Sequence, residues 1–315
     1  MEIVKKKNSK IATVLVTGGS GFIGKHLIKN SKIKKWNIVS LSINKKLNYK
    51  NITEINLDIV NKKLLFEKLN HLKIDYIINL AGHINHYEKK KTFDTHFKGC
   101  KNLIDFAVKK KVKRFIQIGS SVEYGFLSSP VSENTTTNIK NLKSTYGKAK
   151  LKASNYLIKI SKKKKLKYLI LRPFLIYGPG QTINRLIPNI ITNSLKDKNF
   201  PCSLGNQIRD FLYIDDFVDF IIECVETKKV YNEIFNVGSD KPIKVRKVIN
   251  SILNITKKGR PLYGKVLLRK DEPLKLYPNL KKTFKYFKWK PKTILTNGLV
   301  KTINYYKRLN NKKNK

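Results

Sequence analysis

The stretch Thr17-Gly18-Gly19-Ser20-Gly21-Phe22-Ile23-Gly24 decides the fold of this 315-residue chain. It follows the apolar run 11–16 and precedes a segment that is predicted to be helical. Gly18 permits a sharp turn, Gly21 leaves room for phosphates beside the backbone, and Gly24 lets the helix pack close to the strand. The free N–H groups at a helix start attract anions. A strand, a glycine turn and a helix in this order predict a site for a dinucleotide pyrophosphate.

The composition is that of a globular protein, because 41% of the residues are hydrophobic. Residues 1–10 lack the apolar core of a signal peptide, and no later apolar run is long enough to span a membrane. We therefore expect a cytoplasmic protein with no membrane insertion. Cys100, Cys202 and Cys224 are odd in number and lack the spacing of metal ligands, so we expect reduced core thiols, no disulfide and no metal.

The net charge of +46, from 67 Lys and Arg against 21 Asp and Glu, by itself suggests a nucleic-acid partner. Only eight of the 67 are Arg, whereas phosphate and base recognition favours the bidentate Arg fork. The lysines form short runs at predicted helix ends, such as 109–111 and 162–165. We therefore predict no nucleic-acid partner and keep a nucleic-acid-binding Rossmann protein as a remote alternative. The positive field would still attract an anionic nucleotide substrate.

Strands and helices alternate along the first part of the chain. The predicted strands after the glycine loop are 36–43, 52–57, 76–80, 114–119 and 168–172, and the predicted helices are 62–72, 92–109 and 146–162. Repeated βα units predict the α/β class, with a Rossmann-type doubly wound parallel sheet that carries helices on both faces. Ligands of such sheets lie beyond the carboxyl ends of the strands.

The alternation weakens after Gly180, where helices are predicted near 186–195 and 245–255. We expect residues 11–180 to form mainly the dinucleotide-binding Rossmann domain. Residues 181–305 are expected to form mainly a smaller C-terminal substrate-binding domain, with some strands returning to the main sheet. Residues 306–315 are expected to be a frayed tail.

Tyr146 and Lys150 are four residues apart and so share one face of a predicted helix. A tyrosine hydroxyl ordinarily releases its proton near pH ~10, and a neighbouring cation favours the phenolate. Ser120 or Ser121, at the end of the strand 114–119, could hydrogen-bond the same substrate oxygen. A solvated helix face would explain the pair in isolation. Its place downstream of the glycine loop and of a serine-bearing strand end favours catalysis.

Together these motifs resemble an extended short-chain dehydrogenase/reductase of the NAD-dependent epimerase/dehydratase family, which acts on nucleotide sugars. The similarity runs from about residue 11 to residue 300. The glycine loop matches the family's TGxxGxxG, and Asp58-Ile59 resembles the pair beside the adenine. Asn79–Gly82 resembles the segment near the cofactor, and Ser120–Gly125 the serine segment.

The resemblance implies three catalytic residues, Ser120, Tyr146 and Lys150, with Ser120 preferred over Ser121 because it lies four residues before Tyr124. The implied cofactor-binding residues are Gly18, Ser20, Gly21, Phe22, Ile23, Gly24, Ser42, Lys45, Asp58, Ile59, Leu80, Ala81, Gly82, Tyr146, Lys150 and Arg172. The implied substrate-binding residues are His83, Ser121, Phe174, Arg185, Arg209 and Arg269. Arg209 and Arg269 would each donate a bidentate pair to the substrate diphosphate.

Simpler explanations exist for several of these side chains. Without the resemblance, Arg209 would be expected to pair with Asp215 or Asp216, and Arg269 with Glu272. The histidines His83, His86 and His96 are more readily explained as hydrogen-bonded structural residues, although His83 lies where it could approach substrate or cofactor.

The cofactor prediction depends on the end of the second strand, where NAD-preferring members carry an acidic residue. Here Ser42 stands at that position and Lys45 and Lys46 follow it. A hydroxyl followed by two cations suits a 2′-phosphate, so we predict NADP rather than NAD, with a solvated turn as the alternative. The Asp-Glu pair of the dehydratase branch is replaced by Ser121-Val122, which disfavours dehydration. Leu175 stands where many relatives have a substrate-contacting Asn.

The resemblance implies hydride transfer at C4 of a nucleoside-diphosphate hexose. The specific expectation is an NDP-4-keto-6-deoxyhexose reductase of deoxysugar biosynthesis that uses NADPH, and the alternative is an NDP-sugar 4-epimerase. In either reaction Tyr146 exchanges the proton of the C4 oxygen, Ser120 orients that oxygen, and Lys150 holds the nicotinamide ribose. The presence of all three residues argues against an inactive cofactor-binding scaffold. The family also implies a homodimer.

Overall fold

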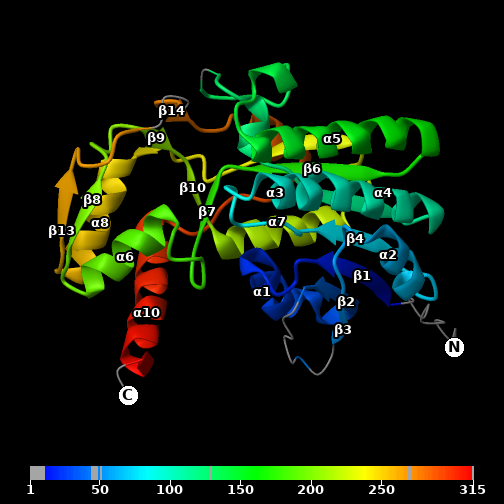
Figure 1. Cartoon of the computed structure of the whole chain (residues 1–315), viewed down its shortest axis with the longest axis horizontal. Helices are drawn as coiled ribbons and strands as arrows, with labels where there is room; N and C mark the ends of the chain where they lie inside the picture. The colour runs from blue at the N-terminus through cyan, green and yellow to red at the C-terminus, as the bar shows by residue number, and fades with distance from the viewer. Residues whose placement is uncertain (1–10, 44–48, 50–51, 128, 269–271, 314–315) are drawn as a thin grey trace, which may run out of the picture.

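The computed structural model describes residues 11–43, 49, 52–127, 129–268 and 272–313 (Figure 1). Its centre is a seven-stranded sheet in the order β11-β6-β5-β4-β1-β2-β3, in which every neighbouring pair is parallel. The strands are β1 (Ala12–Thr17), β2 (Trp36–Ser42), β3 (Ile52–Asn56), β4 (Tyr76–Asn79), β5 (Arg114–Ile118), β6 (Tyr168–Pro173) and β11 (Glu233–Val237). The predicted doubly wound parallel sheet is therefore confirmed.

Alternate residues of β1 point into two separate cores. Val14 and Val16 lie in the same apolar cluster as Leu27 of α1 (Phe22–Lys29) and Phe217 of α7 (Ile214–Glu226). Leu15 lies in a second cluster, with side chains of α2 (Lys62–Leu69), α4 (Cys100–Lys109) and α5 (Thr145–Lys164). Because both faces of the sheet are covered, the strands read as nearly continuous apolar runs.

The predicted helix 92–109 is divided into three segments. They are α3 (Lys89–Phe93), the π-helix η2 (Asp94–Gly99) and α4. Short π-helical segments are rare and occur often at functional sites. This segment carries His96 and packs against α5. The described part of the chain also contains the short 3₁₀ segments η1 (Ser31–Lys35), η3 (Ser121–Tyr124) and η4 (Ile139–Asn141).

A second group of elements lies beyond one end of the main sheet (Figure 1). Its helices are α6 (Leu186–Leu195), α8 (Val245–Thr256) and α10 (Leu295–Lys313). Its short strands are β8 (Asn199–Cys202) paired with β13 (Arg260–Tyr263), and β9 (Ile208–Arg209) between β12 (Ile243–Lys244) and β14 (Lys275–Leu276). Between the two groups, β7 (Leu175–Tyr177) pairs with β10 (Phe211–Tyr213).

The chain returns to the main sheet after leaving it. Strand β11 pairs in parallel with β6, α7 covers one face of the sheet, and α9 (Lys281–Tyr286) contacts β11. The residues beyond 180 are thus shared between the sheet and the second group of elements.

The prediction of a frayed tail from residue 306 is wrong, because α10 continues to Lys313. Tyr306 and Ile303 are buried in the apolar cluster that also holds side chains of α6 and α8. The Tyr306 hydroxyl donates a hydrogen bond to the carbonyl of Gln181. This long-range anchor holds an Asn- and Lys-rich segment in the helix.

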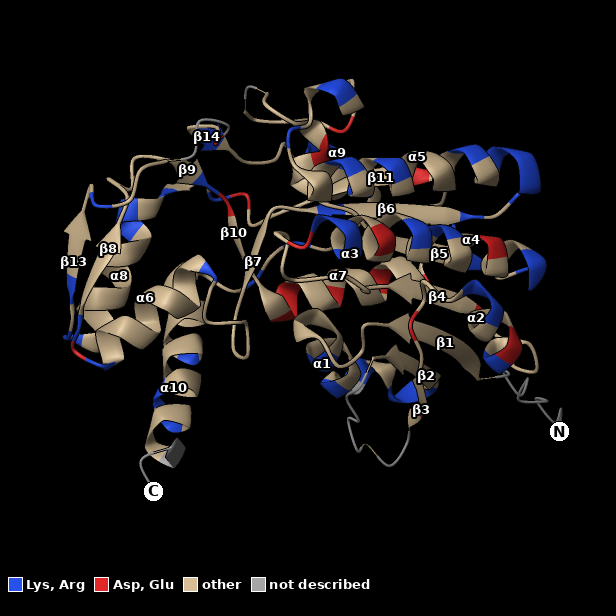
Figure 2. Ribbon diagram, in the orientation of Figure 1, with Lys and Arg blue, Asp and Glu red and all other residues tan. Residues whose placement is uncertain are grey.

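Lys and Arg residues are spread along the helices of both parts of the molecule (Figure 2). The last turn of α5, for example, carries Lys162, Lys163 and Lys164, where cations interact favourably with the helix dipole. The three cysteines are buried in the core, as predicted. Within the described ranges, no helix has both the length and the apolarity needed to cross a membrane.

Candidate active site

The glycine loop joins β1 to α1 at the carboxyl edge of the sheet. Gly18 has φ +68°, and a Cβ on this residue would lie 2.8 Å from the carbonyl oxygen of Leu80. A Cβ on Gly24 would lie 2.3 Å from the carbonyl oxygen of Gly18. Both positions therefore require glycine, one for its conformation and both for space. The Gly21 N–H donates to the Gly18 carbonyl (2.9 Å), which closes the turn in front of α1.

Polar side chains connect the ends of β1, β4 and β5 below this loop. The Thr17 hydroxyl donates to Asn79 Oδ1 (2.7 Å), and Asn79 Nδ2 donates to Gln117 Oε1 (2.8 Å). The Ala81 N–H donates to Thr17 Oγ1 (3.2 Å). These bonds hold the predicted cofactor segment Leu80–Gly82 against the glycine loop.

Ser120 starts η3 directly beyond β5. Its N–H donates to Glu123 Oε1 (2.8 Å), and its hydroxyl accepts a long hydrogen bond from the N–H of Val122 (3.4 Å). This is the capping box that a Ser-x-x-Glu pattern produces. Gly119 is needed here, since a Cβ on it would lie 2.5 Å from Glu123 Oε1. The position of Ser120 is thus set by the fully buried Glu123 side chain.

Glu123 also connects the Ser120 segment to two other elements. Its Oε2 accepts from the hydroxyl of Ser154 on α5 (2.8 Å), and from Nε (3.1 Å) and NH2 (3.0 Å) of Arg172 on β6. The Arg172 guanidinium lies 4.5 Å from the ring centre of Tyr124. The side chain of Arg172, which was predicted to contact the cofactor, is therefore enclosed between Glu123 and Tyr124.

Tyr146 and Lys150 lie in the first two turns of α5, which Ser144 caps by accepting from the N–H of Gly147 (3.0 Å). Lys150 is buried, and its Nζ donates to the carbonyl of Ile118 at the end of β5 (2.7 Å). The same Nζ lies 5.9 Å from the centre of the Tyr146 ring. Lys150, with the Tyr146 ring beside it, therefore lies at the carboxyl end of β5. Ser120 lies two residues beyond Ile118, the last residue of this strand.

Two imidazole rings contact the phenol of Tyr146. His86 is stacked on it, with ring centres 4.2 Å apart and an interplanar angle of 12°. His96 meets it edge-on, at 4.9 Å and 80°. Burial, with Arg185, His83 and Lys150 nearby, lowers the pKa of His86 to about 4. Burial and Lys150 lower the pKa of His96 to about 2, so both rings are neutral at pH 7.

The predicted residues on the adenosine side lie at the ends of β2 and β3. The Ser42 hydroxyl accepts from the N–H of Ser20 in the glycine loop (3.1 Å). Asp58 is exposed, and its Oδ1 accepts from the N–H of Val60 (2.9 Å), while Ile59 is buried. Lys45 lies outside the described residues.

Arg209 is buried, and its NH2 donates to Glu272 Oε1 (2.7 Å). Arg209 therefore pairs with Glu272 rather than with Asp215 or Asp216, the partners expected without the resemblance. Asp215 instead pairs with His26 (3.1 Å), and Asp216 accepts from the N–H of Thr293 (2.9 Å). The other predicted diphosphate residue, Arg269, lies outside the described residues.

The remaining predicted substrate residues occupy different environments. Phe174 is buried in a small cluster with Tyr124 and Val131, and Ser121 is buried in η3. Arg185 is exposed at the start of α6. His83 is half-buried, with Nε2 3.3 Å from Glu88 Oε1.

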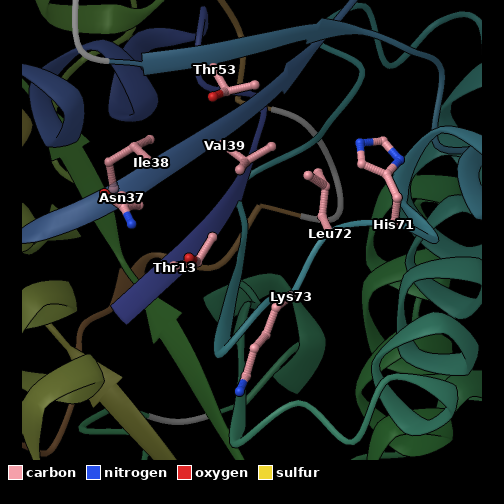
Figure 3. A pocket seen from close by; sticks show the side chains of 8 residues that line it. All are labelled: Thr13, Asn37, Ile38, Val39, Thr53, His71, Leu72 and Lys73. Atoms are coloured by element: carbon pink, nitrogen blue, oxygen red, sulfur yellow. The ribbon is translucent and has the colours of Figure 1, made fainter. Parts of the chain in front are cut away.

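A hollow on the opposite edge of the sheet contains none of the predicted site residues (Figure 3). It is lined by the amino-terminal ends of β1, β2 and β3 and by residues 71–73. Ligands of open parallel sheets bind at the carboxyl ends, so the candidate site is the one around the glycine loop, Ser120 and α5.

Comparison with known proteins identifies the family of this chain. The sequence model described as "NAD dependent epimerase/dehydratase family" matches residues 14–238, which include the glycine loop, Ser120, Tyr146 and Lys150. The chain belongs to this family. The members of the NAD-dependent epimerase/dehydratase family that it resembles are extended short-chain dehydrogenase/reductase enzymes that act on nucleotide sugars.

Relatives within the family include both epimerases and dehydratases. The chain is 30% identical to a dTDP-D-glucose 4,6-dehydratase of Dictyostelium discoideum over 279 residues, which are 78% of this chain and 62% of that protein. It is 29% identical to a putative UDP-glucose 4-epimerase of Methanocaldococcus jannaschii over 94% of this chain and 99% of the relative. The crystal structure of a Thermotoga maritima UDP-glucose 4-epimerase with UDP-glucose has a TM-score of 0.87 and 25% identity, covering 94% and 99% of the two chains.

Glu123, His86 and His96 have larger structural roles than sequence reasoning assigned to them. Glu123 could have been found from the Ser120-x-x-Glu123 pattern, which is that of a capping box. His86 lies 60 residues before Tyr146 in the sequence, and His96 lies 50 residues before it. No local pattern indicates their contacts with Tyr146.

Replacing Glu123 by Gln should destabilise the protein by about 3–5 kcal/mol, because Arg172 would remain buried without its countercharge. Chemical denaturation measures this free energy of unfolding. The matched control is Glu67→Gln at an exposed position, which should change it by less than about 0.5 kcal/mol. Equal stabilities of the two variants would contradict the role given to the buried pair.

Stability should also fall as the pH is lowered below about 6.5. The unfolded chain then binds a proton at His96, whose ordinary pKa is 6.5, whereas the folded chain resists protonation down to a pKa of about 2. Between pH 6.5 and 5 the wild type should lose about 1.7 kcal/mol more than His96→Phe, because the loss approaches about 1.4 kcal/mol per pH unit only below the unfolded pKa. Urea unfolding at both pH values measures the difference, and identical pH dependences would show that His96 is not buried in its neutral form.

Proposed function

We propose that this protein transfers a hydride at C4 of a nucleoside-diphosphate hexose with a nicotinamide cofactor. The observation that carries the proposal is the position of Tyr146 and Lys150. The Lys150 ammonium is bonded to the end of β5, beside Ser120, on the same sheet edge as the glycine loop. This arrangement supports the proposal, because Tyr146 would act as acid/base, Lys150 as a cation and Ser120 as a hydroxyl donor at the edge where ligands of such sheets bind.

The glycine loop has the turn that a dinucleotide site requires, because Gly18 takes φ +68° and the absence of a Cβ at Gly24 lets α1 pack directly against the loop. Residues 18–24 would hold the pyrophosphate against the start of α1. Ser42 and Asp58 would contact the adenosine half, and Leu80–Gly82 with Lys150 the nicotinamide half. When bound, the cofactor supplies a hydride acceptor and donor beside the sugar.

Tyr146 takes the proton of the C4 hydroxyl while C4 loses its hydride, which leaves a 4-ketone. The Lys150 ammonium stabilises the phenolate form of Tyr146 electrostatically as the proton moves. The Ser120 hydroxyl hydrogen-bonds the same sugar oxygen and orients it. Return of the hydride to C4 is accompanied by return of the Tyr146 proton to the oxygen, so the tyrosine ends the cycle as it began.

The nucleotide half of the substrate is assigned to arginines. Arg185, exposed at the start of α6, and Arg209, held by Glu272, would approach the diphosphate, as would Arg269. The charge of +46 would raise the local concentration of such an anion. The Thermotoga maritima structure with UDP-glucose supports a uridine nucleotide as the first substrate class to test.

The 4-epimerase is the first candidate reaction, because the relatives that match nearly the full length of this chain include a putative UDP-glucose 4-epimerase. The NDP-4-keto-6-deoxyhexose reductase is the second, and Ser42 favours it because NADPH is the usual source of reducing power for such a step. The epimerase returns the hydride to the opposite face of the sugar. Sugar interconversion without added cofactor supports the epimerase, and dependence on added NADPH supports the reductase.

Tyr146→Phe should lower kcat by at least about 100-fold, since it removes the proposed acid/base. Binding of the nucleotide sugar should change little, because the phenyl ring is retained. Steady-state kinetics and calorimetry measure the two effects. The matched control is Tyr156→Phe, which removes a hydroxyl from the same helix where it bonds Asp105. Activity of Tyr146→Phe equal to that of this control would contradict the mechanism.

Ser42→Asp should shift the preference between NAD and NADP toward NAD by about tenfold or more, because a carboxylate repels a 2′-phosphate and accepts from ribose hydroxyls. The ratio of the two dissociation constants measures the shift. An unchanged ratio would mean that Ser42 does not face the adenosine ribose. A wild type that binds NADP more weakly than NAD would remove the argument for the reductase.

A further inference from the structure

The segment that follows β4 wraps around the ring of Tyr146. His86 covers one face of the phenol, and His96 of the π-helix η2 contacts its edge. The two imidazoles lie 6.1 Å apart at 77° to each other. The phenol therefore meets two mutually perpendicular rings, neither of which belongs to the predicted catalytic set.

His96 is itself held firmly. A Cβ on Gly82 would lie 2.6 Å from His96 Cε1, so the Gly82 backbone rests against this ring. The His83 N–H donates to His96 Nε2 (3.2 Å). His96 is only 5% exposed and sits between the predicted cofactor segment and Tyr146. The buried His96 ring therefore packs against the edge of the Tyr146 phenol.

His86 occupies a different kind of position, in a turn rather than in the core. It is half-buried, and the turn is closed by the Glu88 N–H, which donates to the Asn85 carbonyl (3.1 Å). Asn85 Nδ2 also donates to Glu88 Oε1 (2.9 Å). The turn therefore presents the His86 ring to the phenol without help from a packed core. Because burial and nearby cations keep this ring neutral, it adds no charge beside Lys150.

We propose that His86 is a positioning residue, which fixes the plane of the Tyr146 phenol by stacking on it while His96 supports the ring edge. The inference rests on the proposed role of Tyr146 as acid/base. A stacked aromatic pair contributes only a small interaction free energy. Loss of the stacking should therefore reduce the fraction of molecules in which the Tyr146 hydroxyl is oriented toward the sugar oxygen. It is the flat ring of His86, rather than its nitrogen atoms, that does this.

The test compares His86→Ala and His86→Phe in the full-length enzyme. His86→Ala should lower kcat by about five- to tenfold with KM for the nucleotide sugar within about threefold. His86→Phe keeps a flat ring and should restore kcat to within about twofold of the wild type. His71→Ala is the matched control, because His71 is exposed at the opposite edge of the sheet (Figure 3).

A second readout does not depend on activity. With 3-fluorotyrosine at position 146, the fluorine resonance should shift in His86→Ala, because the ring current of the stacked imidazole is lost, and should stay unchanged in His71→Ala. An unshifted resonance in His86→Ala overturns the stacking itself. Equal loss of kcat in His86→Ala and His86→Phe overturns the claim that the ring plane matters.

The inference and the proposed function fail in different ways. Full activity of His86→Ala beside an inactive Tyr146→Phe overturns the positioning role and leaves the acid/base in place. Full activity of Tyr146→Phe overturns the acid/base and with it the functional meaning of the stacking.

Discussion

The geometry of the candidate site depends on the hydrogen bonds that the buried carboxylate of Glu123 accepts. It accepts hydrogen bonds from the Ser120 backbone, from Ser154 on α5 and from Arg172 on β6. These contacts set the serine segment, the helix that bears Tyr146 and Lys150, and a central strand relative to one another. A buried ion pair is weak evidence for stability in general. Here its four hydrogen bonds connect the Ser120 segment, α5 and β6.

Sequence reasoning identified what local patterns encode. The glycine loop follows from the φ/ψ preference of glycine, and the alternating strands and helices follow from hydrophobic periodicity. The four-residue spacing places Tyr146 and Lys150 on one helix face, and the structure contains all three features. The ion-pair partner of Arg209 and the helical tail could not be derived from the sequence, because they depend on long-range contacts. Glu272 lies 63 residues from Arg209, and Tyr306 is anchored 125 residues away at Gln181. Tertiary packing decides such contacts, and local propensity does not.

The proposed acid/base Tyr146 is surrounded by side chains from three different segments of the chain. Lys150 bonds the end of β5, while His86 and His96 pack on the phenol from the segment after β4. Both imidazoles are neutral at pH 7, so neither adds a positive charge beside the phenol. The positive charge near the Tyr146 ring comes from Lys150. Ser42 also stabilises the glycine loop, because its hydroxyl accepts a hydrogen bond from the Ser20 N–H. This contact is separate from the cofactor contact proposed for Ser42.

The most direct test of hydride transfer at C4 uses a nucleoside-diphosphate hexose deuterated at C4. Mass spectrometry follows the label in the sugar product and in the cofactor released after denaturation. Deuterium should pass from C4 to the nicotinamide during turnover and back to C4 in the epimerised product, without loss to water. Loss of the label to solvent, or epimerised product formed while the cofactor never carries deuterium, would contradict hydride transfer at C4.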